Sequence, residues 1–344
     1  EWRQSRPGTL CQSPCVSLFS TVVDFLKPNA PIDPALGKAL DKVGELVDPL
    51  LKMAPGFERQ LAFPLQHALG YCAGLVASLP GPIEINRQAF ANDPLVHALF
   101  ATADDIDQML GRSQAVRDFL AEPESWESDH FYALFAARRQ HKKQLGIERQ
   151  GEVIQNDVPQ LVLYFADHML VEPCCQLELS HEKLRAKALE SLLRTFHDHV
   201  EALRLERQGL RADVSVQRAH LAVLRGTTPG PEYIVGSRHL ADLDARLHQS
   251  GESLMPAQLL AALAEFLAAP EPALHLSPVS ITVDRLGIIR EQTSDDLDLH
   301  TLNFPELTAR DRRHYLAMFA RIRRDEAREA VEMVLDQQRR FMLL

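Results

Sequence analysis

The residues whose spacing alone could do chemistry are two aspartates and a histidine late in the chain. Asp296, Asp298 and His300 alternate along the sequence. Alternate residues of an extended segment point to the same side. Three oxygen and nitrogen donors would then converge, as hard or borderline divalent metals require. No glycine-bearing calcium-loop pattern surrounds the three residues, so we favour the alternative, a solvated acidic linker.

A second grouping is the pair His197–Asp198, inside a predicted helix. The pair resembles the core of the HD-type metal-dependent phosphohydrolases, which are largely helical. The resemblance implies that an upstream His and a downstream Asp complete a divalent-metal site that activates water. The candidates for these two further ligands are His168 or His181, and Asp242 or Asp244. The set His168, His197, Asp198 and Asp242 is therefore an alternative metal site.

The sequence after the pair departs from that family. His199, Val200 and Glu201 stand where the family has small, apolar residues. A two-residue motif also occurs often by chance. We therefore favour a solvated helix flank that carries His197 and Asp198 without a metal.

Arginines concentrate near the C-terminus, in a segment that we predict to be helical. They are Arg310, Arg312, Arg313, Arg321, Arg323, Arg324 and Arg328. Such a run can meet phosphates, which gives an RNA-associated regulatory factor as a third functional alternative. Asp325 and Glu329 neutralise part of the run, and Arg324–Arg328 and Asp325–Glu329 stand at helical spacing. We favour a salt-bridged solvent face.

Motifs and composition exclude several classes of protein. The sequence contains no P-loop, GxGxxG, GxSxG or HExxH motif, so no reaction can be named. The formal net charge of −10 lacks the basic excess of a free nucleic-acid binder, and we expect no nucleic-acid partner. Five cysteines in 344 residues do not form a disulfide framework, which favours a reducing cytoplasm.

The most regular element of the sequence is a heptad repeat within residues 184–224. Its a and d positions form an apolar seam of Leu189, Leu193, Phe196, Val200, Leu203, Leu210, Val214, Leu221 and Leu224. Only Arg207 and Gln217 interrupt the seam. In a parallel pair of such helices, the flanking charges would match, Glu206 with Arg211 and Asp213 with Arg218. We predict an interaction seam for a protein partner or a homo-oligomer.

The alternative, which we favour, is a seam that packs inside the same chain, as one amphipathic helix or two. Gly209 favours a break, because glycine costs about 1 kcal/mol in a helix interior. A break there would fold the stretch into an αα-hairpin.

The rest of the chain divides into three predicted parts. Residues 1–17 are a poorly ordered segment, and 18–122 a helical region with proline-set helix starts. Residues 61–83 carry no formal charge, but prolines interrupt them, so we expect a buried helix and no membrane contact. Residues 123–344 form an α+β region with an antiparallel sheet at about 131–166 and 279–290. Its long helices span about 181–225 and 308–342.

We therefore predict a predominantly helical α+β protein with a small antiparallel sheet. The function that we favour is a non-enzymatic intracellular scaffold or assembly protein that acts through helix-mediated contacts and needs no cofactor. The alternative is an HD-like phosphohydrolase with a divalent metal.

Overall fold

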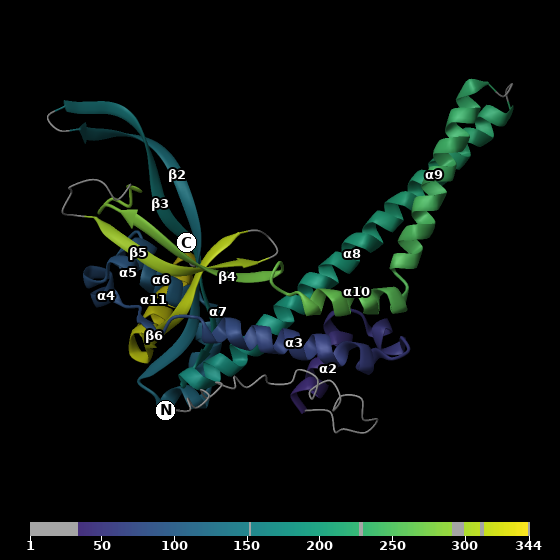
Figure 1. The fold of residues 1–344 in the computed structure, drawn as a ribbon. Helices are drawn as coiled ribbons and strands as arrows, with labels where there is room; N and C mark the ends of the chain where they lie inside the picture. The colour runs from purple at the N-terminus through teal and green to yellow at the C-terminus, as the bar shows by residue number, and fades with distance from the viewer. Residues whose placement is uncertain (1–33, 151–152, 227–229, 291–298, 310–312, 343–344) are drawn as a thin grey trace, which may run out of the picture.

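The computed structural model describes residues 34–150, 153–226, 230–290, 299–309 and 313–342. The chain is α+β and mostly helical, with one sheet that is antiparallel apart from a single short strand, as the sequence predicted (Figure 1). The predicted poorly ordered segment 1–17 lies outside the described residues. No helix in the described ranges is long and apolar enough to cross a membrane.

Helices fill the first part of the described chain, and all but one of them have 13 residues or fewer. They are α2 (Pro34–Leu46), η1 (Pro49–Met53), α3 (Phe57–Ala77), α4 (Arg87–Asn92), α5 (Pro94–Leu99), α6 (Ala103–Arg112), α7 (Gln114–Ala121) and η2 (Pro123–Glu127). Their starts follow from local chemistry. Asp93 caps α5 by accepting a hydrogen bond from the Leu95 amide at 2.8 Å, and Pro94 is the first helical residue.

The strands form one sheet in the order β3-β2-β6-β5-β4. Their bounds are β1 (Ile83–Glu84), β2 (His130–Gln150), β3 (Val153–Cys174), β4 (Leu274–Val283), β5 (His300–Ala309) and β6 (His314–Arg323). The short β1 pairs in parallel with β6, and the other pairs are antiparallel. Beyond Arg138, β2 no longer pairs with β6, so β2 and β3 continue as a projecting two-stranded ribbon (Figure 1).

The late hairpin joins the early strands, as predicted. Gly287 takes a positive φ of 75°, the left-handed conformation expected of the turn after β4. The Leu163 amide donates to the Gly287 carbonyl at 2.8 Å, and the Ile289 amide donates to Leu161 at 2.8 Å. Ile289 also bridges to Val283. This segment therefore links β4 to β3, the strands at the two ends of the strand order.

The predicted helix over 308–342 is wrong in its first third. Residues 314–323 form β6, and only Arg324–Met342 is helical, as α11. Leu316, Met318, Ala320 and Ile322 are buried in one core, while Phe319 on the other face is buried in a second cluster. A strand buried on both faces reads as a continuous apolar run, which periodicity cannot distinguish from a helix.

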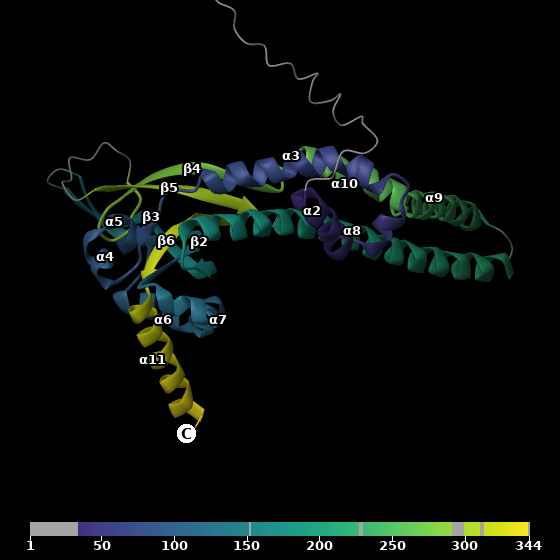
Figure 2. The ribbon, with the colours of Figure 1, turned by 90° about the horizontal axis from the view of Figure 1, so that it is seen from below.

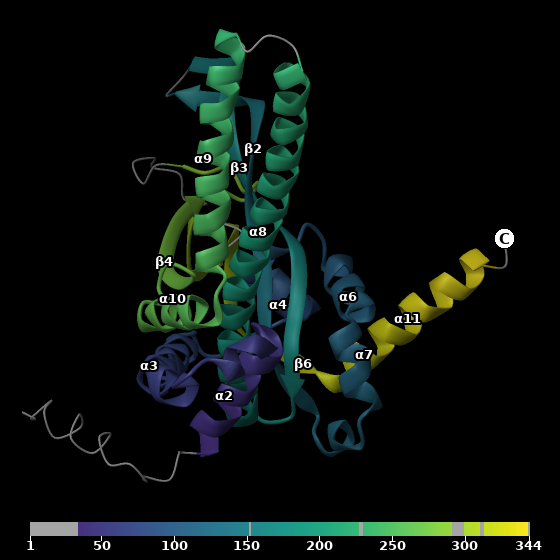
Figure 3. The ribbon, with the colours of Figure 1, turned by 90° about the vertical axis from the view of Figure 1, so that its right-hand side faces the viewer.

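One helix dominates the second half of the chain. α8 (Leu177–Gly226) runs unbroken through Gly209, and α9 (Pro231–Ser253) folds back beside it (Figure 3). The predicted alternative of a hairpin that turns at Gly209 is therefore wrong, and the turn falls after Gly226. α10 (Pro256–Ala268) follows. We call the paired helices from residue 203 of α8 through α9 the arm.

Two large cores hold the body together. One lies between the sheet and the helices α4 to α7 and α11. The other joins α2, η1, α3 and α10 to the first part of α8. Figure 2 shows α3 and α10 lying along α8, with α11 projecting from another side. Neither core follows the predicted boundary near residue 122, because α4–α7 pack on the sheet while α2 and α3 pack on α8.

Candidate functional site

The residues of the alternative metal site do not come together. His197 on α8 donates its Nδ1 hydrogen to the Val47 carbonyl at 2.9 Å. His168 on β3 donates from Nε2 to the Leu99 carbonyl at 2.6 Å, in the other core. Asp198 and Asp242 are exposed on α8 and α9. The geometry therefore gives the HD-like site no support.

Those of the remaining candidate ligands that the structure describes form no metal site. His181 packs its ring edge-on against Phe319, with ring centroids 4.5 Å apart. Asp296 and Asp298 lie outside the described residues, and His300 begins β5. Within the described ranges, no group of three or more His, Cys, Asp or Glu side chains could hold a metal ion.

Four of the C-terminal arginines that the structure describes are in ion pairs: Arg321, Arg323, Arg324 and Arg328. Arg321 on β6 contacts Glu84 at 3.0 Å, and Arg328 on α11 contacts Asp325 at 3.9 Å. Arg310 and Arg312 lie outside the described residues. These pairs favour the salt-bridged surface over a phosphate-binding run.

The apolar seam of α8 is covered within the chain. Leu189, Leu193, Phe196 and Val200 are buried in the core with α2, α3 and α10, while Leu210 and Val214 pack on Leu243 of α9. Leu203 and Leu224 are half-buried, and Leu221 is buried. As a surface for a second chain the seam is already occupied.

The charges that flank the seam also find partners in α9. Arg218 contacts Asp244 at 2.9 Å, and Glu206 contacts Arg246 at 3.9 Å. From the sequence we predicted that Glu206 and Arg218 pair with charges on a second copy of the helix. In the structure they pair instead with residues of α9, which lies antiparallel to α8 in the same chain.

The two interruptions of the seam meet glycines of α9. Gln217 donates its side-chain amide to the Gly236 carbonyl at 3.1 Å. A Cβ added at Gly236 would lie 3.0 Å from that amide, and one added at Gly251 would lie 3.3 Å from a terminal nitrogen of Arg207. Glycine in α9 thus makes room for the polar side chains in α8.

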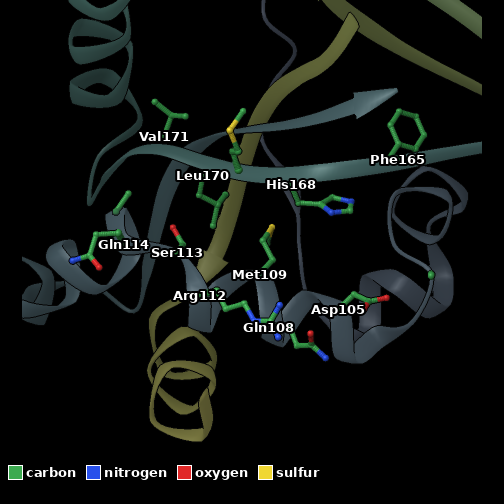
Figure 4. Close-up of a pocket in the computed structure, with 13 residues that line it drawn as sticks. Asp105, Gln108, Met109, Arg112, Ser113, Gln114, Phe165, His168, Leu170 and Val171 are labelled. Atoms are coloured by element: carbon green, nitrogen blue, oxygen red, sulfur yellow. The ribbon is translucent and has the colours of Figure 1, made fainter. Parts of the chain in front are cut away.

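One pocket has the predicted residue His168 in its wall (Figure 4). Its volume is about 660 Å³, and Gln108, Met109 and Arg112 of α6 line it opposite His168 and Leu170 of β3. The strand register shifts between Ala136 and Arg138, beside His168. Asp167 there has a positive φ of 52° and contacts Arg138 at 2.8 Å. Such bulges re-aim side chains next to sites.

Two polar side chains of this pocket, His168 and Ser113, already make hydrogen bonds within the chain. Burial lowers the pKa of His168, so the imidazole is neutral at pH 7. Because Nε2 donates to Leu99, Nδ1 is the hydrogen-bond acceptor of the ring. The Ser113 hydroxyl accepts from the Val116 amide as the cap of α7. The pocket therefore offers polar groups on an apolar wall, without an activated nucleophile.

Sequence reasoning missed a second apolar face on α8. We call it the outer stripe: Leu205, Gly209, Ala212, Val216, Ala219 and Val223. These residues recur at steps of four and three, and all six are exposed. Leu205, Val216 and Val223 are 70%, 68% and 71% exposed. The signal was in the sequence, because the outer stripe repeats the seam with an offset of two residues.

A comparison of the chain with family models, curated proteins and solved structures found no match.

Proposed function

We propose that the protein is a non-enzymatic assembly protein that acts through helix-mediated contacts, with the arm as its contact element. The observation that carries the proposal is the outer stripe. A helix at the surface normally carries one apolar face and one polar face. In the arm, α8 has a covered seam and a second apolar face in solvent. Ile234 and Val235, 57% and 66% exposed, add apolar surface on α9.

The occupant that we propose for the outer stripe is a second copy of the same arm. A two-helix hairpin that pairs with another hairpin gives a four-helix bundle, a common way to bury such faces. Two antiparallel α8 helices related by a twofold axis near residue 214 would place the outer stripe of one against the outer stripe of the other. Leu205 then meets Val223, and Gly209 meets Ala219. The small residues permit close approach of the two helices.

The charges beside the outer stripe are compatible with this pairing. One flank carries Gln208, Ser215 and Ala222, which are all uncharged. On the other flank, Glu206 of one copy would face His220 of the next. Asp213 of one chain would face Asp213 of the other, which is a contact between like charges. Asp213→Asn is therefore expected to tighten the association.

The competing functions have less support. His168, the pair His197–Asp198 and Asp242 lie on three different elements, and four of the described C-terminal arginines are in ion pairs. The cytoplasmic location stays a prediction. The free thiols Cys72, Cys174 and Cys175 support it, since adjacent Cys174 and Cys175 form no disulfide.

Sedimentation velocity over a concentration series of the full chain tests the proposal. The unchanged protein should form a dimer, and Val216→Asp should shift it to monomer. The variant should melt at the same temperature as the unchanged protein at a dilution where the dimer dissociates, because Val216 is 68% exposed in the monomer. The matched control is Ile147→Asp on the β2–β3 ribbon, where an apolar residue of similar exposure, 66%, receives the same charge.

The control variant should dimerise like the unchanged protein. A monomer at all concentrations would rule out the second copy and leave a helix of another protein as the occupant. Equal loss of the dimer in both variants would show that the outer stripe is not the interface.

A further inference from the structure

Three arginines gather where the arm leaves the body. Arg204, Arg207 and Arg211 stand on α8 at spacings of three and four residues, which places them on one face of the helix. Together with Gln208 and Leu254, at the end of α9, they line a pocket of about 420 Å³. The pocket lies between the seam, which Arg207 interrupts, and Gln208 on the flank of the outer stripe.

The positive charge of this pocket is only partly neutralised. Arg204 is held by Asp48 and by Glu201, the latter at 2.5 Å. For Arg207 and Arg211, no carboxylate in the described ranges lies within ion-pair distance. Two guanidinium groups one helical turn apart therefore face the pocket without a counter-charge, and like charges at this spacing destabilise a helix.

Arg207 is also the residue that interrupts the seam. An apolar side chain at this a position would add to the packing between α8 and α9. The Nε of Arg207 is buried and has no hydrogen-bond partner among the described residues. Gly251 of α9 leaves the space in which the guanidinium lies. The seam of the arm thus contains a charged side chain, Arg207, and the absence of a side chain at Gly251 leaves room for it.

We propose that this pocket binds a small molecule that carries a phosphate or diphosphate group. The planar guanidinium fork matches phosphate oxygens and donates charge-assisted hydrogen bonds to them. Arg207 and Arg211 supply the two free positive charges, Gln208 an amide, and Leu254 an apolar contact for the rest of the ligand. Such a ligand would satisfy the buried Nε and remove the repulsion between the two arginines.

A small ligand fits better than a nucleic-acid strand. The pocket is confined to about two turns of α8 and the end of α9, whereas a strand needs a continuous basic track. The chain as a whole is acidic, with a net charge of −10. The ligand would touch both helices of the arm, and its binding should therefore stabilise the folded protein.

Thermal unfolding of the full chain with pyrophosphate, at constant ionic strength, tests this inference. The unchanged protein should gain about 2 °C or more in melting temperature at saturating pyrophosphate. Arg211→Gln should lose this gain. The matched control is Arg218→Gln, which removes a charge from the same helix face two turns further, where Asp244 already neutralises it. This control should keep the gain.

Arg207→Leu separates loss of binding from loss of folding. Leucine restores the seam, so the variant should melt at a higher temperature than the unchanged protein and yet show no gain with pyrophosphate. The inference is overturned if pyrophosphate has no effect on the unchanged protein, or if Arg218→Gln loses as much of the gain as Arg211→Gln. It is also overturned if a short single-stranded RNA displaces pyrophosphate and binds more tightly.

Discussion

At the scale of single residues, Glu306 is a buried carboxylate of the sheet with partners on two other strands. Only 5% of this β5 residue is exposed. Arg139 of β2 donates to both of its carboxylate oxygens, to Oε1 at 3.2 Å, and His314 of β6 contacts Oε1 at 2.9 Å. A buried charge is tolerated only when it is paired. One carboxylate therefore ties the consecutive strands β5 and β6 to β2, where Arg139 lies 167 residues before Glu306.

We predict that Arg139→Met lowers the free energy of unfolding by about 3 kcal/mol, because it leaves Glu306 buried without its main counter-charge. Urea denaturation of the full chain measures the change. The double variant Arg139→Met with Glu306→Leu should be more stable than the single one, since it removes both charges. A single variant as stable as the unchanged protein would show that His314 and water are sufficient partners.

At the scale of elements, α8 shows how packing overrides local propensity. The sequence favoured a break at Gly209, yet the helix continues for 50 residues. Val200 before the glycine and Leu210 after it both belong to the apolar seam, and both are buried. Burial of these apolar side chains, worth about 1.5–3 kcal/mol each, outweighs the cost of about 1 kcal/mol for one glycine.

Two glycines of the arm should respond in opposite directions to alanine. Gly209→Ala should raise the free energy of unfolding by up to about 1 kcal/mol, because it lies in a continuous helix and its added Cβ meets nothing within 4 Å. Gly236→Ala should lower it, since its Cβ would lie 3.0 Å from both Gln217 and Leu221. Urea denaturation measures both. Destabilisation by Gly209→Ala would show that α8 is broken there in solution.

The features of the fold that could be predicted from the sequence are those that depend on a few neighbouring residues. The turn at Asp284–Gly287 and the cap at Asp93 follow from a few adjacent residues, and both are present in the structure. The strand β6, His314–Arg323, was missed, because its pairing with other strands, above all with β2 nearly two hundred residues earlier, distinguishes it from a helix. The same holds for candidate sites. The sequence shows that Arg207 interrupts the apolar seam. It does not show the pocket around Arg207, because that pocket forms only where the end of α9 folds back against α8.

At the scale of the whole molecule, α8 passes through regions of very different packing density. Its first part lies in the core with α2, α3 and α10. Its last part packs on α9 through a small cluster around Leu210, Val214 and Leu243, together with ion pairs at the surface. Regions with few buried apolar contacts open locally at a lower free energy than the cores. The arm and the body are therefore expected to behave as separate cooperative units joined by one helix.

Native-state hydrogen exchange should reveal this division within α8. In dilute protein, where dimers dissociate, amides of residues 210–224 should exchange at a lower free energy of opening than those of 189–200. Leu210→Ala should speed exchange throughout the arm, because it empties the centre of the small cluster. The same variant should leave exchange in β2 and β6 unchanged, since Phe135 and Met318 belong to the other core. Equal protection along the whole of α8, or a response of β6 to Leu210→Ala, would show instead that arm and body unfold as one unit.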